Sequence, residues 1–181
     1  MKIELEQVKP ADIEKRSFEI IESELPHDID SELAPIIKRA VHTSADFDYV
    51  DNLCFSEDVV SKALESIKNG ACIVTDTQMA KAGINKAELK KHGGEVFCFM
   101  SDDDVRDMAK KNGSTRARAS MEKAAQMDRP LIFAIGNAPT ALIRVYELIQ
   151  EGLLKPELVI GVHVGFVNVV QSKELIMQCD V

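Results

Sequence analysis

The stretch Leu131-Ile132-Phe133-Ala134-Ile135-Gly136-Asn137-Ala138-Pro139-Thr140 decides the fold class of this chain of 181 residues. Five apolar residues come first without polar alternation, and a turn that opens a helix follows them. A strand without alternation is buried on both faces, as in a parallel sheet that helices cover on each side. Pro139 suits a first helical turn, because its missing N–H would be unpaired there. The stretch therefore predicts one strand–helix unit of an α/β domain.

Other parts of the chain repeat this organisation. Three further apolar runs without alternation occur, at Ala71–Thr75, Val96–Met100 and Leu158–Val164. Helical patterns separate the runs, at Asn85–Lys91, Asp102–Met127 (with Asn112-Gly113 as the place for a break) and Ala138–Gln150. Buried strands that alternate with helices predict a mainly parallel sheet in a three-layer α/β/α domain, with right-handed crossovers.

The N-terminal part of the chain is expected to be a helical segment. One helix has a mostly apolar face and ends at Pro26. A second helix, capped by Asp30 or Ser31, carries Arg39 and His42 at its C-terminal end. Two titratable side chains are thereby placed at one helix terminus.

Composition limits the class of protein. A hydrophobic fraction of 45% with 29% charged residues is globular, and a net charge of −8 argues against nucleic acid or an anionic membrane as partner. No apolar run reaches membrane-spanning length, and the N-terminus lacks the apolar core of a signal peptide. The four cysteines share no CxxC spacing and are expected to be reduced thiols. We expect a single cytoplasmic domain over residues 1–181.

The carboxyl ends of the predicted strands are the expected ligand-binding edge, because open α/β sheets bind ligands there. Gly136 permits close backbone approach, and Asn137 is a plausible helix cap. Free N–H groups at the start of that helix would seat a carboxylate or a phosphate. An ordinary strand-to-helix turn is the alternative, and no GxGxxG fingerprint is present.

His42 and a few arginines are the remaining candidates for chemistry. At a helix C-terminus the dipole favours a protonated imidazole, so His42 is a candidate proton donor, with a simple capping histidine as the alternative. Arg116 and Arg118 open a helix after a glycine and could bind an anion, whereas a solvated surface role is the default for Arg118 and Arg144. No spacing of metal ligands and no GxSxG motif occurs, so neither a metal site nor a hydrolase triad is expected.

Six short motifs occur in order along the whole chain. They are Glu14-Lys15-Arg16-Ser17-Phe18, Arg39-Ala40-Val41-His42-Thr43, Asp76-Thr77-Gln78-Met79 with Gly83-Ile84, Ser114-Thr115-Arg116, Gly136-Asn137-Ala138-Pro139-Thr140-Ala141-Leu142 and Gly161-Val162-His163-Val164-Gly165-Phe166-Val167-Asn168. Together they resemble the precorrin-8X methylmutase family, also called precorrin isomerase, of cobalamin biosynthesis.

The resemblance implies an isomerase that needs no cofactor. The family moves a methyl group on ring C of precorrin-8X or cobalt-precorrin-8 and gives hydrogenobyrinate or cobyrinate, so any cobalt belongs to the substrate. His42 matches the family's active-site histidine, Ser17 and Arg39 match its substrate-binding serine and arginine, and Arg116 matches a further active-site arginine. The resemblance also implies a homodimer. Because the ring carries many carboxylates, Gly136, Asn137 and Thr140 at the helix start are expected to bind it too.

Two features depart from the family, and two other functions remain as alternatives. Position 163 is His where the family usually has Pro, and family members continue past Val181 with a further strand. We therefore expect a chain shortened at its C-terminus, with a sheet edge left exposed. The main alternative is a tetrapyrrole-binding protein without turnover. A second is an unrelated α/β enzyme for a phosphorylated metabolite, suggested only by the helix-end anion seat.

Overall fold

Leu131–Ile135 forms strand β3 at the centre of a four-stranded sheet in the computed structural model, which describes residues 5–181. The strand order is β2-β1-β3-β4, and β3 pairs with β1 (Cys72–Thr75) on one side and β4 (Leu158–Gly161) on the other. The strand β2 (Val96–Phe97) pairs with β1. Every pair is parallel, which confirms the predicted sheet.

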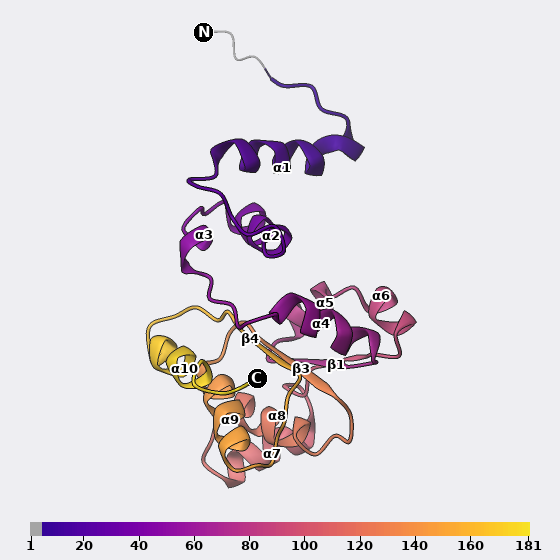
Figure 1. Ribbon diagram of the computed structural model, residues 1–181. Helices are drawn as coiled ribbons and strands as arrows, with labels where there is room; N and C mark the ends of the chain where they lie inside the picture. Colours follow the sequence, from indigo (N-terminus) through magenta and orange to yellow (C-terminus); the bar gives the residue numbers. More distant parts are fainter. Residues whose placement is uncertain (1–4) are drawn as a thin grey trace. The chain divides into compact units, whose positions relative to one another are not determined.

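Helices cover both faces of this sheet (Figure 1). On one face lie α4 (Val59–Lys68), α5 (Gln78–Gly83) and α6 (Lys86–Lys91). On the other lie α7 (Asp103–Lys111), α8 (Arg116–Ala124), α9 (Pro139–Gln150) and α10 (Val169–Ile176). The three-layer α/β/α architecture is therefore confirmed. It explains why β3 shows no polar alternation, since Leu131, Ile132, Phe133 and Ile135 are all at most 2% exposed.

The chain separates into two compact units, Met1–Val60 and Ser61–Val181, with the boundary in the first turn of α4. We call them the helical unit and the α/β unit. The helical unit holds a 3₁₀ turn (Pro10–Asp12), α1 (Ile13–Glu24), α2 (Ala34–Ser44) and α3 (Tyr49–Asn52). Its apolar cluster consists of the buried side chains Ile21, Ile37, Val41 and Val50. A single domain can contain both units, so the prediction of one domain stays a prediction.

Local structure differs from the sequence prediction at a few points. The helix α2 begins only at Ala34, because the Asp30 carboxylate accepts the N–H of Glu32 at 2.8 Å and forms a turn before the helix. The strand β4 ends at Gly161, so His163 lies in the following loop, where its side chain is buried. The break at Asn112-Gly113 is confirmed: Gly113 has φ +59°, between α7 and α8. The sequence pattern does not predict the short helices α3, α5 and α10, which the structure contains.

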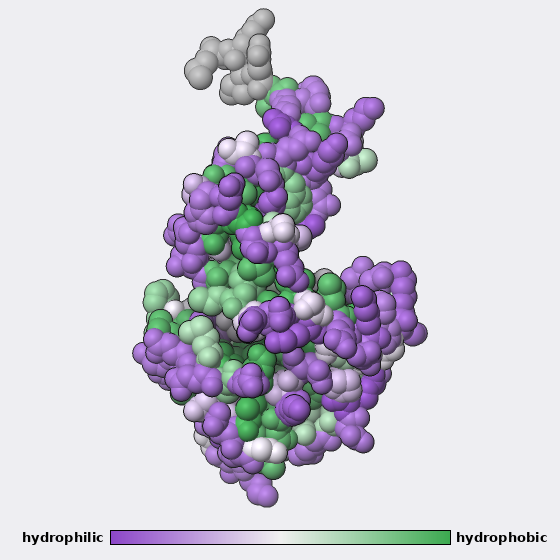
Figure 2. All heavy atoms as spheres, in the orientation of Figure 1, coloured by the Kyte–Doolittle hydropathy of each residue, from purple (hydrophilic) through white to green (hydrophobic). Residues whose placement is uncertain are grey.

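The surface agrees with the charged composition. Hydrophilic side chains dominate the face drawn in Figure 2, with smaller hydrophobic areas between them. No helix among residues 5–181 is long and apolar enough to cross a membrane. All four cysteines are free, as expected, and Cys72 and Cys98 are buried.

Candidate functional site

One group of predicted site residues meets where α1 faces α2. Arg39 and His42 lie one turn apart on α2, and Ser17 lies on α1 beside Phe18. The Phe18 ring stacks on the His42 imidazole, with 5.2 Å between ring centroids and 15° between the planes. The same ring lies 4.8 Å below the guanidinium carbon of Arg39. The structure thus brings a candidate proton donor and a candidate anion-binding group together around one aromatic ring.

Arg39 holds a carboxylate of its own chain. Its guanidinium donates a hydrogen bond to Glu14 on α1, and both side chains are largely exposed. That hydrogen bond and the Arg39 charge lower the pKa of the Glu14 carboxyl, with a smaller contribution from the charge of His42. Arg39 therefore already shows the interaction with a carboxylate that a polycarboxylate substrate would require.

Ser17 is occupied within its own helix. Its hydroxyl donates to the carbonyl of Ile13 at 2.9 Å, one turn earlier on α1. A hydroxyl in that bond keeps lone pairs and can still accept a hydrogen bond. The structure is therefore consistent with a polar contact from Ser17, and its binding role stays a prediction.

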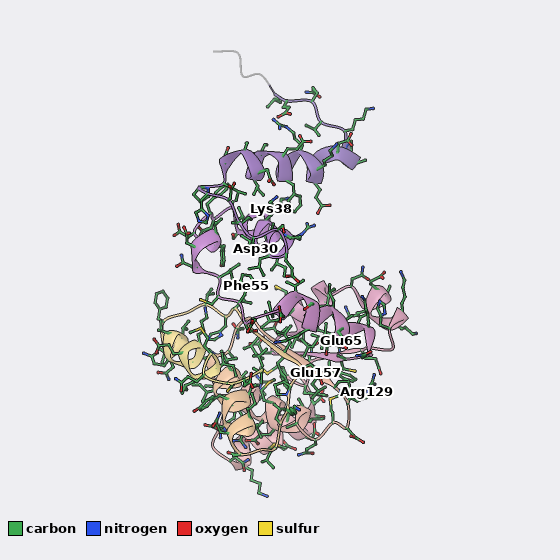
Figure 3. All side chains as sticks on the ribbon, viewed as in Figure 1. Asp30, Lys38, Phe55, Glu65, Arg129 and Glu157 are labelled. Atoms are coloured by element: carbon green, nitrogen blue, oxygen red, sulfur yellow. The ribbon has the colours of Figure 1, made fainter. Side chains whose placement is uncertain are left out.

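A cavity of about 580 Å³ opens in the helical unit next to this group. Its walls come from α1, α2 and the segment between them, and they include Phe18, Arg39 and Ile29. Lys38 also lines the cavity and pairs with Glu22 of α1; Figure 3 shows Lys38 on α2. The mixture of apolar walls and paired charges is typical of a site for an amphipathic ligand.

The second group of predicted residues lies in the α/β unit, where the turn after β3 differs from its prediction. The N–H groups of Gly136, Asn137 and Ala138 donate to the Asp76 carboxylate at 2.9, 2.8 and 2.6 Å. Asp76 follows β1 and is fully buried. The expectation of a free anion seat is wrong at these three groups, because a carboxylate of the chain fills it. The phosphorylated-metabolite alternative loses the observation that suggested it.

A pair of threonines joins the start of α9 to the start of α8, where Arg116 lies. The hydroxyl of Thr140 lies 2.9 Å from that of Thr115, and Thr115 caps α8 by accepting the N–H of Arg118. Arg116 is the first residue of α8 and is exposed. Within residues 5–181 no acidic side chain pairs with its guanidinium. Arg116 is therefore available for a ligand carboxylate.

The neighbouring arginines are structural. Arg118 binds Glu147 at 2.6 Å, and Arg144 binds both Glu147 and Glu151 at 2.9 Å. The Arg144 side chain is only 12% exposed, so the expectation of a solvated arginine is wrong there. The guanidinium groups of Arg118 and then Arg144 lower the pKa of the Glu147 carboxyl. The Arg118–Glu147 pair, together with a pair between Arg144 and Glu122 of α8 at 3.1 Å, fastens α8 to α9.

The predicted residues thus form two groups, Ser17, Arg39 and His42 in the helical unit, and Arg116, Gly136, Asn137 and Thr140 in the α/β unit. Sequence reasoning missed the roles of Phe18, Glu14 and Asp76 in these groups. All three stand in the motifs already quoted, and Glu14 and Phe18 are four residues apart on one helix face. No group of three or more His, Cys, Asp or Glu side chains in the described chain is arranged to hold a metal ion.

Comparisons with known proteins agree on one family. The family model described as Precorrin-8X methylmutase matches residues 12–181. The chain is 46% identical over 168 residues to the cobalt-precorrin-8 methylmutase of Priestia megaterium, covering 92% of this chain and 75% of the relative. It is 40% identical to the enzyme of the same name from Leptospira interrogans, covering 93% and 78%. The solved precorrin-8x methyl mutase of Thermus thermophilus superposes with a TM-score of 0.82 at 35% identity, covering 94% of this chain and 83% of that one.

Proposed function

The chain belongs to the precorrin-8X methylmutase family, and from this premise we propose that His42 supplies and recovers the proton in its reaction. The protein is an isomerase of cobalamin biosynthesis that moves a methyl group on ring C of the corrin precursor. The observation that carries the proposal is the contact of His42 and Arg39 with one ring, beside a cavity.

The chemistry needs only proton placement and a fixed substrate. Donation of a proton by His42 to the conjugated macrocycle leaves electron deficiency on the ring. The methyl group then migrates to the adjacent carbon with its bonding electron pair, and the return of a proton to the imidazole restores the original charge. Reactant and product contain the same atoms, so the step requires neither a redox cofactor nor an added group. Holding the reacting geometry supplies much of the rate enhancement.

We propose that the carboxylates of the substrate bind two arginines, one without an acidic partner and one whose acidic partner can be displaced. Arg116 has no acidic partner among the described residues, and the Arg39 guanidinium can exchange its exposed Glu14 partner for a substrate carboxylate. Ser17 and Thr140 add hydroxyl groups to the two sites. Gly136 and Asn137 would contribute shape and a side-chain amide, since Asp76 occupies their N–H groups. We propose that the protein works without a metal or cofactor of its own.

The substrate form, location and assembly are also proposals. Both curated relatives described above are named for cobalt-precorrin-8, which favours the cobalt-containing form as the substrate. Four free cysteines and the acidic composition support a cytoplasmic location, with neither nucleic acid nor membrane as partner. We also propose that the protein works as a homodimer. Comparing turnover of the cobalt and metal-free precursors would decide the first point.

The function is tested by mixing the purified protein with cobalt-precorrin-8 and recording the visible spectrum, because methyl migration changes the conjugation of the ring. We expect conversion by the parent and a loss of at least 100-fold in His42→Ala, in line with the usual effect of removing a general acid–base group. His92→Ala is the matched control, because His92 is also exposed and lies at the C-terminal end of a helix, α6. Binding without conversion by the parent would instead support the tetrapyrrole-binding alternative.

A further inference from the structure

Phe18 contacts both side chains on which the proposed chemistry depends. Its ring lies 5.2 Å from the His42 ring in a stacked arrangement and 4.8 Å from the Arg39 guanidinium carbon. Arg39 and His42 are three residues apart on α2, so they project from the same side of that helix toward α1. One aromatic ring thus fixes two planar groups by stacking and by a cation–π contact.

His42 and Arg39 need such a support because burial does not hold them. Both are exposed, and the Arg39 side chain is 56% exposed. Exposed long or planar side chains keep much of their rotamer freedom, which works against a reaction that requires a fixed proton donor. Glu14 forms an ion pair with Arg39 and does not contact His42. That pair is exposed, and exposed ion pairs contribute little free energy toward fixing a side chain. Of Glu14 and Phe18, only Phe18 contacts both groups.

Phe18 is not part of the apolar core of the helical unit. Among the described residues, the half-buried side chains that pack against that core include Leu25, Phe47 and Phe55, and Phe18 is absent from this set. Phe18 instead lines the 580 Å³ cavity together with Arg39. Its position is that of a side chain between a binding cavity and a catalytic group.

We propose that Phe18 is a positioning residue, whose ring sets the orientation of the His42 imidazole and keeps Arg39 at the same site. This inference rests on the proposed function of His42. Phe18 takes no part in proton transfer, and it acts by limiting the rotamers of its two neighbours. A flat six-membered ring is the property required, so tyrosine can replace phenylalanine whereas leucine cannot.

The test compares Phe18→Leu with Phe18→Tyr and uses Phe55→Leu as the matched control. Phe55 lies in the same unit, after α3 (Figure 3). It packs against the apolar core of that unit, whereas the ring stacked on His42 is Phe18. The first readout is the proton NMR spectrum of the His42 ring, identified by its absence in His42→Ala. We expect its ring-current shift to disappear in Phe18→Leu and to persist in Phe18→Tyr and Phe55→Leu.

The second readout is turnover of cobalt-precorrin-8. A misplacement of about 1 Å can cost roughly 100-fold in rate, so we expect a loss of kcat of about 10- to 100-fold in Phe18→Leu, with a rise in KM. Phe18→Tyr should recover most of both, and Phe55→Leu should change mainly the melting temperature. If Phe18→Leu does not fold, Phe18→Met, which is longer and more flexible, takes its place.

Two results would overturn the inference. One is an unchanged His42 spectrum in Phe18→Leu, and the other is a kcat and KM in Phe18→Leu equal to those of Phe55→Leu. A parent protein that binds the precursor without converting it would reject the proposed function instead, and the NMR readout would still report whether Phe18 orients His42. The two failures are therefore distinguishable.

Discussion

At the scale of single residues, the pairing of each arginine separates binding candidates from structural ones. Arg118 and Arg144 are held by Glu147, whereas Arg116 has no acidic partner in residues 5–181. Local sequence places all three in similar helical surroundings, and only the family resemblance singles out Arg116. An unpaired guanidinium on an acidic protein is the group that a polycarboxylate ligand would be expected to meet.

We predict that Arg116→Ala weakens binding of the corrin precursor and leaves the fold intact. Losing one hydrogen bond to a charged group costs about 1.5–3 kcal/mol, which corresponds to a rise in Kd of roughly 10- to 150-fold. Titration of the precursor followed by its visible spectrum would measure this. Arg106→Ala is the control, because the exposed Arg106 pairs with Asp103 within α7. An unchanged Kd in Arg116→Ala would place the carboxylate contact elsewhere.

At the scale of elements, buried Asp76 joins the end of β1 to the start of α9. Three N–H groups and the positive end of the α9 dipole compensate for the burial of its charge. Two loops at the carboxyl edge of the sheet are thereby locked together. The turn Gly136–Ala138, which the sequence suggests as an anion-binding site, therefore has a structural role. The neighbouring hydrogen bond between Thr140 and Thr115 connects this turn to the N-terminus of α8.

We predict that Asp76→Asn lowers the free energy of unfolding by about 3 kcal/mol. The amide oxygen can take the place of Oδ2 and keep the N–H groups of Asn137 and Ala138, but the NH₂ group then faces the N–H of Gly136. One lost hydrogen bond to a charged group costs about 1.5–3 kcal/mol, and the two remaining bonds lose their charge. Urea unfolding would measure the difference. In the control Asp102→Asn, loss of the partly exposed Lys123 ion pair should cost at most about 1 kcal/mol. Equal effects of the two variants would contradict the capping role of Asp76.

At the scale of the whole molecule, the loop between β4 and α10 leaves apolar side chains in contact with solvent. Val164, Phe166 and Val167 are all more than 70% exposed, and Phe166 is fully exposed. Apolar side chains gathered in this way are typical of a surface that another protein covers. They support this loop as part of the contact in the proposed homodimer.

We predict that Phe166→Asp shifts the protein from dimer to monomer, because a charge in an apolar contact is costly to desolvate. Light scattering after size-exclusion chromatography would give the two masses, with circular dichroism to confirm that the variant is folded. Leu153→Asp is the control, since Leu153 is an exposed leucine after α9, outside this loop. A parent protein that runs as a monomer at all concentrations would rule out the proposed dimer.

The sequence by itself determined the α/β class, the parallel sheet and the helix break at Gly113, because these follow from local patterns of burial and backbone freedom. The six motifs also led to the family, which the comparisons confirm. Only the tertiary structure decided the partners of the individual site residues. Asp76 reaches a turn 60 residues further along the chain, and Phe18 reaches His42 on another helix. Such contacts depend on how elements pack, and no local pattern encodes which side chain will fill an anion seat or cover an imidazole.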